Sequence, residues 1–227
     1  MAITATLLTS GSSTTDSTTF TTASISPTAN RLVVIKVGSG DAGSAAVAPT
    51  SVVGAGLTFA AINDQTVNNG FSRVAVWRAL SASPGSGALT ITFSATMESC
   101  VWIVEEYADV DTGGTNGSAA IVQSAKASGI GTTSGSVTLA AFGDAVNNAV
   151  SSAWHHSNNF VVTPEAGYTE ITELNEPSWT AQLESSWKIG EDTTVTASWS
   201  AISSWGGICF EIKASSAVVT LMGQACL

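Results

Sequence analysis

The amino-acid sequence predicts an all-β fold: an antiparallel β-sandwich, jelly-roll-like, built from two sequence-related halves. Three observations predict it. Short segments such as LTITFS from Leu89 and TVTASWS from Thr194 alternate apolar and polar residues, the pattern of strands with one solvated face. No stretch of the chain has a helical period. Finally, two stretches about a hundred residues apart resemble each other, which indicates an internal repeat.

The repeat predicts how the sandwich is built. WSAISSWGGICFEIK from Trp199 echoes FSATMESCVWIVEEY from Phe93, and VAVWRAL, with Trp77, parallels ESSWKIG, with Trp187. In the first of these matches, Glu211 corresponds to Glu105. Each half alone would leave an apolar face uncovered, so we expect one sandwich in which the halves cover each other. Two small tandem sandwiches are the alternative.

The elements follow in order along the chain. Residues 1–19 form a polar, Ser/Thr-rich arm, expected to be extended or mobile. Residues 20–213 form the sandwich, with halves at about 20–111 and 118–213, and residues 214–227 form an apolar tail. LVVIKV, beginning at Leu32, predicts a central strand buried on both faces. SPGSG predicts a turn, and the glycine-rich residues 112–117 predict the seam between the halves. The expected total is about ten to twelve strands.

Charge excludes two classes of partner. Only 11% of the residues are charged, and the net charge is -10. Residues 1–97 carry three acids and four bases, whereas residues 98–227 carry fourteen acids and three bases. Because nucleic acids and anionic membranes are bound by basic surfaces, the sequence predicts neither as a partner. MAITATLLTS lacks the basic and long apolar regions of a secretory signal, and no stretch is apolar enough for a membrane span.

The pattern of Ala-Gly-x-Thr, a strand with a central tryptophan, an SPGSG turn, LTITFS and VWIVEEYADVD resembles a β-sandwich module. We associate this module with proteins of tailed-phage virions and with bacterial extracellular proteins. It covers most of residues 20–213. The resemblance implies a fold and a setting, and it brings no catalytic residues with it.

No catalytic or cofactor site is expected from the sequence. Asp109 and Asp111 are weak candidates for a calcium site, but the remaining ligands of a calcium loop are missing, so a solvated strand end is expected for the acidic stretch from Glu105. The glutamates of EITELNE are expected on the wet face of a strand rather than as a glycosidase pair. His155 and His156 end a strand and point to opposite faces.

Ligand or interface candidates lie in two segments. Trp179 follows a loop-like stretch that contains Glu176, where an exposed indole ring could stack on a sugar or anchor an interface. The uncharged tail must dock on its own sandwich or on a neighbour. Cys226 also offers an intermolecular disulfide, whereas Cys100 and Cys209 are expected to be buried thiols. The tail candidates are Val218, Val219, Leu221, Met222, Cys226 and Leu227.

These features predict a structural protein of a phage virion, made in the host cytoplasm and released by lysis. The specific expectation is a capsid decoration or cement protein that bridges neighbouring capsid subunits. Its partners would be the major capsid protein or other virion subunits, and further copies of itself. The alternative is a tail-fibre or secreted extracellular module that binds a glycan or a receptor, and no enzymatic activity is predicted.

Overall fold

A computed structural model describes residues 2–176 and 181–216 of the chain. Within these residues the protein is all-β and antiparallel, with fifteen strands, two single-turn 3-10 helices and no α-helix. The count exceeds the expected ten to twelve, and two of the fifteen are two-residue strands that no periodicity could reveal. The elements are β1 (Thr4–Ser13), β2 (Ser17–Thr21), β3 (Leu32–Gly40), β4 (Pro49–Gly54), β5 (Leu57–Thr58), β6 (Ala60–Val67), η1 (Asn68–Gly70), β7 (Ser72–Leu80), β8 (Leu89–Met97), β9 (Ser99–Ala108), η2 (Ser118–Ala120), β10 (Ile121–Thr138), β11 (Ala149–His156), β12 (Thr163–Pro164), β13 (Thr169–Glu176), β14 (Ala181–Ile189) and β15 (Thr194–Ile212).

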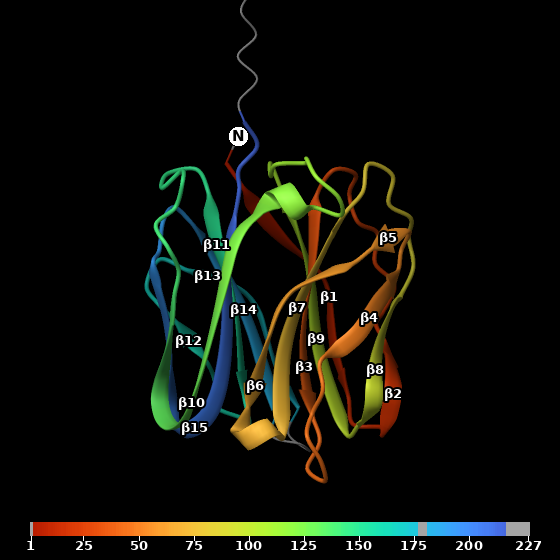
Figure 1. The fold of residues 1–227 in the computed structure, drawn as a ribbon, viewed down its shortest axis with the longest axis vertical. Helices are drawn as coiled ribbons and strands as arrows, with labels where there is room; N and C mark the ends of the chain where they lie inside the picture. Colours follow the sequence, from red (N-terminus) through yellow and green to blue (C-terminus); the bar gives the residue numbers. More distant parts are fainter. Residues whose placement is uncertain (1, 177–180, 217–227) are drawn as a thin grey trace, which may run out of the picture.

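The strands form three sheets. The first sheet has the order β1-β9-β3-β7-β6, and the second has the order β10-β15-β11-β14-β13, with β12 paired to β15 outside this path. The third sheet has the order β2-β8-β4-β5. In Figure 1 the second sheet lies on the left, the first sheet in the middle and the third sheet on the right.

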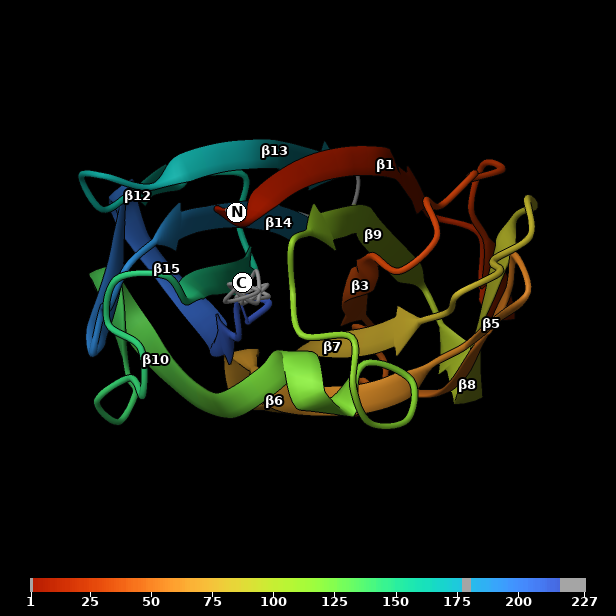
Figure 2. The same ribbon diagram turned by 90° about the horizontal axis from the view of Figure 1, so that it is seen from above.

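Apolar side chains fill three cores. The central core lies between the first and second sheets and contains Val34, Ile103 and Phe210. The first outer core, between the first and third sheets, contains Ile35 and Trp102. The second outer core is enclosed by β11, β12 and the long strands β10 and β15, and contains Trp154. Seen from above in Figure 2, the molecule is therefore a row of packed β-layers.

β3 shows how the sequence sets these layers. It pairs with β7 on one side and β9 on the other, which confirms the predicted central strand. Because side chains alternate along a strand, Val33 and Ile35 enter the first outer core, whereas Leu32 and Val34 enter the central core. A β-branched run suits this position because both faces pack against apolar layers.

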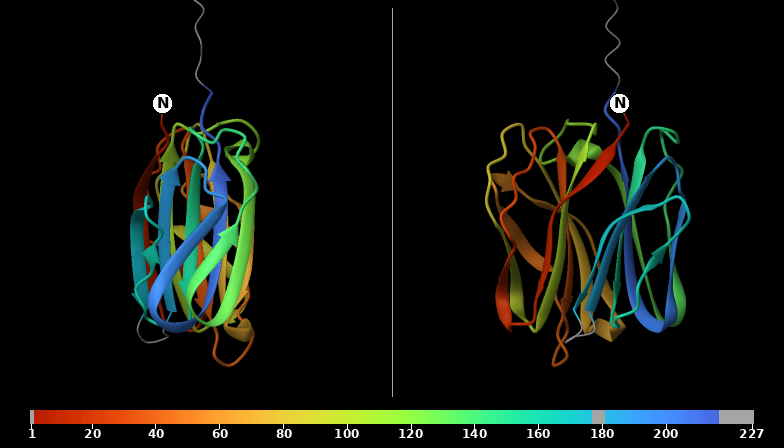
Figure 3. Two further views of the ribbon diagram at one scale, coloured as in Figure 1. Left: turned by 90° about the vertical axis from the view of Figure 1, so that its left-hand side faces the viewer. Right: turned by 180° about the vertical axis from the view of Figure 1, so that it is seen from behind.

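Side chains close the two long edges of the central core. At one edge β1 lies beside β13, where Ser12 donates a hydrogen bond to Glu176 at 2.8 Å. At the other edge β6 lies beside β10, where Asn63 donates to Ser124 at 3.2 Å and Lys126 to the Asp64 carbonyl at 2.7 Å. The views in Figure 3 show the strands of both sheets running along the long axis. No helix in the described ranges is long and apolar enough to cross a membrane.

The N-terminal segment is extended, but it is a strand of the first sheet rather than a free arm. Residues 4–13 pair with β9 from Thr4↔Ala108 to Ser13↔Cys100. Ile3, just before β1, is fully buried in the central core. A Ser/Thr-rich segment suits an edge strand because one of its faces remains in solvent.

Residues matched by the sequence repeat do not occupy matching faces. Trp77 packs on the first outer core, whereas Trp187 packs on the central core against Tyr107, with ring centroids 6.2 Å apart. Glu105 likewise faces the central core, whereas Glu211 lies opposite Val150 and faces the other side of its sheet. A shift by an odd number of residues explains this, because it moves every side chain of a strand to the opposite face.

Candidate functional site

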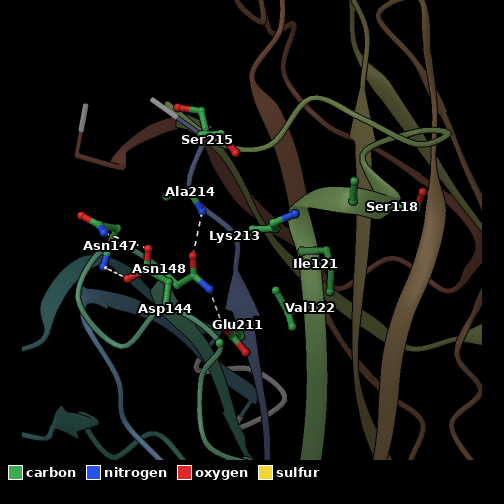
Figure 4. Close-up of a pocket in the computed structure, with 13 residues that line it drawn as sticks. Ser118, Ile121, Val122, Asp144, Asn147, Asn148, Glu211, Lys213, Ala214 and Ser215 are labelled. Carbon is green, nitrogen blue, oxygen red and sulfur yellow. Dashed lines mark hydrogen bonds between the residues drawn. The ribbon is translucent and has the colours of Figure 1, made fainter. Parts of the chain in front are cut away.

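A pocket lies at the end of the molecule where β15 finishes (Figure 4). Its volume is about 640 Å³, large enough for a small ligand or a short peptide segment. The pocket is formed by η2 and the start of β10, by the loop before β11 and by the residues that follow Glu211. Ile121 and Val122 supply an apolar wall, and Asp144, Asn148, Glu211 and Lys213 supply polar groups.

The loop before β11 is shaped by Asp144. Its carboxylate accepts hydrogen bonds from the backbone N–H groups of Val146 and Asn147, and from the Asn147 side chain at 2.8 Å. The Asn147 side chain is the largest cause that lowers the pKa of Asp144, so this carboxylate is charged at neutral pH. The sequence DAVNN therefore forms a turn in which a short acidic side chain replaces backbone partners.

Glu211 and Asn148 form the polar floor of the pocket. Asn148 Nδ2 donates to Glu211 Oε1 at 2.5 Å, and Gln123 Nε2 donates to Oε2 at 2.7 Å. Asn148 Oδ1 accepts the Ala214 N–H at 3.0 Å, so one amide connects the floor with the end of the described chain. Both carboxylate oxygens of Glu211 already have donors. The floor therefore fixes the shape of the pocket and does not present a free acid.

The calcium candidates lie beside this pocket and are engaged in other contacts. Asp111 Oδ2 accepts a hydrogen bond from Lys213 Nζ at 2.8 Å, and Oδ1 accepts the Gly113 N–H at 2.8 Å. The bond from Lys213 is the largest cause that lowers the pKa of Asp111. Asp109 takes a left-handed backbone conformation, and its carbonyl accepts the Ser215 N–H. In residues 2–176 and 181–216, no group of three or more His, Cys, Asp or Glu side chains could hold a metal ion.

The chemistry of the pocket suits a neutral partner. The described acids and amides of the floor are hydrogen-bonded to one another, and the Lys213 ammonium is paired with Asp111. Asp144 and Glu211 make the site unfavourable for anions. The apolar wall of Ile121 and Val122 then favours an uncharged, partly apolar segment.

A second polar group lies in the middle of the central core. Lys36 on β3 is fully buried and pairs with Glu105 Oε1 at 2.8 Å. Its ammonium also donates to Ser151 Oγ and to the Ser152 carbonyl at 2.8 Å, and to Ser185 Oγ at 2.6 Å. The acceptors come from β9 in the first half and from β11 and β14 in the second. Lys36 therefore connects the two facing sheets.

Glu105 is equally well paired. Ser185 Oγ donates to Glu105 Oε2 at 2.6 Å, and Tyr107 Oη lies 2.7 Å from Oε1 and 2.8 Å from Ser151 Oγ. Burial, followed by the Glu105 charge, raises the pKa of Tyr107, so its hydroxyl stays protonated. The solvated strand end that the sequence predicts is wrong for Glu105 and also for Glu106. Glu106 is buried and accepts Arg31 Nη1 at 2.8 Å.

A third polar group borders the second outer core and is poorly paired. His156 and Glu184 are fully buried, and neither ring nitrogen of His156 nor either carboxylate oxygen of Glu184 has a hydrogen-bond partner in the described structure. Burial raises the pKa of Glu184 to about 8 and lowers the pKa of His156 to about 3. Both side chains are therefore neutral at pH 7, which limits the cost of burying them.

The two histidines do point to opposite faces. His155 faces the central core beside Gly38, where an added Cβ would lie 2.7 Å from Nδ1. Its Nδ1 lies 2.8 Å from the Gln182 carbonyl, and burial lowers its pKa to about 4. The His156 ring packs on Trp199 with centroids 4.1 Å apart. Both imidazoles are packing groups with no access to solvent.

Other sequence candidates have mixed outcomes. Glu176 ends β13 and accepts the hydrogen bond from Ser12, so it supports the contact between β13 and β1. Cys100 and Cys209 are free, buried thiols, as predicted. The remaining candidates lie outside the described residues: Trp179, Val218, Val219, Leu221, Met222, Cys226 and Leu227.

Sequence reasoning missed Lys36 and Glu184. Lys36 lies within a β-branched run that predicts burial on both faces, so a charge there was itself a signal of a buried partner. Glu184 lies in the mixed stretch QLESS and carried no comparable signal. Comparison with known proteins finds no matching family model, curated relative or solved structure.

Proposed function

We propose that this chain is a structural protein of a phage virion that decorates the capsid and holds neighbouring capsid subunits together. The observation that carries the proposal is the location of the chain ends. The start of β1 and the end of β15 lie at the same end of the molecule (Figure 1). The residues that line the pocket include those that follow the end of β15. An attachment surface at one end leaves the rest of the molecule exposed on the particle.

The contacts at this end support its use for attachment. Residues after β15 are held by a backbone bridge between Ala214 and Val110 and by the Asn148 amide. The chain beyond Ser216 is uncharged in sequence, and the pocket suits an uncharged segment. Subunit contacts made by terminal segments therefore remain the favoured mechanism.

Charge and packing also support an outer position. Fourteen of the seventeen acids lie in residues 98–227, so an inward location against packaged DNA would be repulsive. Three packed cores in a 227-residue chain give a molecule suited to resisting tension rather than to changing shape.

We also propose that the two halves share a structural plan. When the five strands of each path are ranked by their order in the chain, both sheets have the same spatial order: first, fifth, second, fourth, third. Gly11 lies opposite Trp102 in one half and Gly129 lies opposite Trp205 in the other, and both tryptophans enter an outer core. The pair Trp102 and Trp205 therefore supports the plan better than Trp77 and Trp187. Jelly-roll-like connectivity stays a prediction.

Immunogold electron microscopy of particles from the source culture tests the virion proposal. An antibody raised against the purified chain is expected to label phage heads evenly. Label confined to tail tips would contradict capsid decoration and favour a tail protein that binds a receptor. Label on cell envelopes without particles would overturn it and leave the extracellular glycan-binding module as the reading to test.

Removal of residues 215–227 tests the attachment mechanism. The truncated chain is expected to remain folded, since most of its described contacts lie before Ser215, and to lose binding to particles stripped of the full-length protein. Cosedimentation measures the binding, and circular dichroism checks the fold. A folded truncation that still cosediments at the full-length level would contradict attachment through the terminal segment.

A further inference from the structure

β13 is an edge strand whose inner neighbour carries a buried acid. Among the described strands its backbone pairs only with β14, through a ladder that runs from Thr169↔Trp187 to Glu176↔Ala181. The register shifts between Glu170 and Thr172. Because of this bulge, Glu170 and Glu173 lie opposite Ser186 and Glu184 on the same face of the sheet, although they are three residues apart.

The acid on β14 has only weak compensation, from the Lys36 charge and the Ser186 side chain, which its burial outweighs. Glu184 is fully buried, and both of its carboxylate oxygens lack a hydrogen-bond partner in the described structure. Glu173 lies directly opposite and is half-buried. Its Oε1 accepts the Val162 N–H at 2.6 Å and also a hydrogen bond from Gln182 Nε2. Burial is the largest influence on Glu173 and raises its pKa, whereas its hydrogen bonds favour the charged carboxylate.

The other elements packed around Glu184 supply little positive charge. β11 contributes His156, which is neutral, and β15 contributes the Cys209 thiol, whose pKa is raised by burial. From the first sheet come Tyr107 and Lys36, and the Lys36 ammonium already has four acceptors. Burial is the largest cause that raises the pKa of Glu184 to about 8. The Lys36 charge and the Ser186 side chain oppose this shift, and the charges of Glu170 and Glu173 add to it. On β14 itself, Lys188 is paired with Asp192 at 2.8 Å.

We propose that Glu184, with Glu173 and Glu170, makes β13 a pH-sensitive edge strand. The strand stays docked while Glu184 carries a proton. Loss of that proton places a third charged carboxylate beside the other two in a buried site, and opening of β13 relieves the repulsion by letting water reach Glu184. The population of the opened strand therefore increases as the pH rises.

Opening of β13 has a defined structural consequence. The strand carries Glu176, which accepts the hydrogen bond from Ser12 of β1, so its release also loosens one closed edge of the central core. It leaves unpaired those backbone donors and acceptors of β14 that face β13, while β14 stays paired with β11. An unpaired edge of this kind is a site where another strand can add. This inference is independent of the virion proposal, because it concerns a property of the isolated chain.

Hydrogen–deuterium exchange of the full-length protein between pH 6 and 9, corrected for intrinsic exchange rates, tests the inference. Glu184 has the ordinary glutamate pKa when β13 is open and the raised pKa when β13 is docked. Protection of residues 169–176 is therefore expected to fall about tenfold per pH unit from pH 6 to 8 and then level off. Residues of β3 are expected to keep their protection across the range.

Two variants distinguish opening of β13 controlled by Glu184 from a loss of protection with another cause. Glu184→Gln keeps the shape of the protonated acid and is expected to make the protection of β13 independent of pH. Glu176→Gln changes a carboxylate on the same strand but on its other face, and is expected to keep the wild-type pH dependence. If Glu184→Gln loses protection with the same slope as the wild type, the inference is wrong.

A direct titration keeps the inference testable if the Glu184→Gln variant fails to fold. Carboxyl ¹³C resonances of the wild-type protein report each glutamate separately, and one glutamate is expected to titrate well above the ordinary range, near pH 8. A set of glutamates that all titrate near pH 4.5 would overturn the inference without any variant.

Discussion

The central core and the second outer core both bury ionisable side chains, but with opposite local chemistry. In the central core the Lys36 ammonium has four acceptors and the Glu105 carboxylate has three donors or cations. In the second outer core Glu184 and His156 have no hydrogen-bond partners within the described structure. The difference teaches that burial alone does not fix the protonation state. Lys36 and Glu105 satisfy each other, whereas burial raises the pKa of Glu184 and lowers that of His156, so both are neutral at pH 7.

The largest expected effect comes from breaking the paired core. Lys36→Met removes the cation and leaves Glu105 buried without a compensating charge, so the free energy of unfolding should fall by about 3–5 kcal/mol. Urea denaturation at pH 7 measures the loss. The double variant Lys36→Met with Glu105→Gln should recover part of it. If the single and double variants are equally stable, the buried charge is not the cause.

Three buried groups with shifted pKa values predict the pH dependence of stability. Burial lowers the pKa of His155 and His156 to about 4 and about 3, so their contribution is complete above pH 6.5 and decreases as the pH falls. Burial raises the pKa of Glu184 to about 8, so its contribution is complete below pH 4.5 and decreases as the pH rises. These three groups predict maximum stability near pH 6.5, with slopes of about 1.4 kcal/mol per pH unit on either side.

Urea denaturation at closely spaced pH values measures this profile. The Glu184→Gln variant should lose most of the decline between pH 6.5 and 8 and keep the decline below pH 6. A variant that keeps the alkaline decline would show that another group, such as Glu173, is responsible for it.

A smaller, opposite effect is expected from replacing the unpaired acid with an apolar side chain. Glu184→Met removes a polar group that has no partner, and it should raise the free energy of unfolding at pH 8 by about 1–3 kcal/mol. The same denaturation measurement checks the sign. A loss of stability would mean that ordered water or a protein group satisfies Glu184 in solution, and the contrast with Lys36 would weaken.

The smallest effect is expected at the exposed pair beside the pocket. Lys213 is about half exposed, and solvent screens its attraction to Asp111. Lys213→Ala should therefore lower the free energy of unfolding by less than about 1 kcal/mol. Urea denaturation of this variant measures the effect of losing an exposed ion pair, against which the loss in Lys36→Met is compared. A loss as large as that of Lys36→Met would show that the pair organises the whole pocket end.

Several parts of the fold could be predicted from local sequence. The β-branched run of β3 and the alternation in β8 identified strands because burial on two faces or on one face leaves different patterns. SPGSG identified the turn between β7 and β8. The repeat identified similar stretches but not their faces, because a shift of one residue reverses the faces and leaves composition unchanged.

The candidate site was less predictable. Asp144, Asn148 and Glu211 come from distant parts of the chain, and only the packing of β10, β11 and β15 brings them together. Asp111 could be named from the sequence as an acid in a loop, but its partner Lys213 lies 102 residues away. No pattern of period two or of short spacing encodes such a contact.

By itself the sequence determined that this protein is made of antiparallel strands, is poor in charge and concentrates its acids after residue 97. These are local or additive properties, set by side-chain alternation and composition. Only the tertiary structure decided which charges are paired. Lys36 meets Glu105, Ser151 and Ser185 from three other strands, whereas Glu184 meets other acids across a bulged edge. Electrostatic energy depends on distance in space and on burial, and neither can be read from order along the chain.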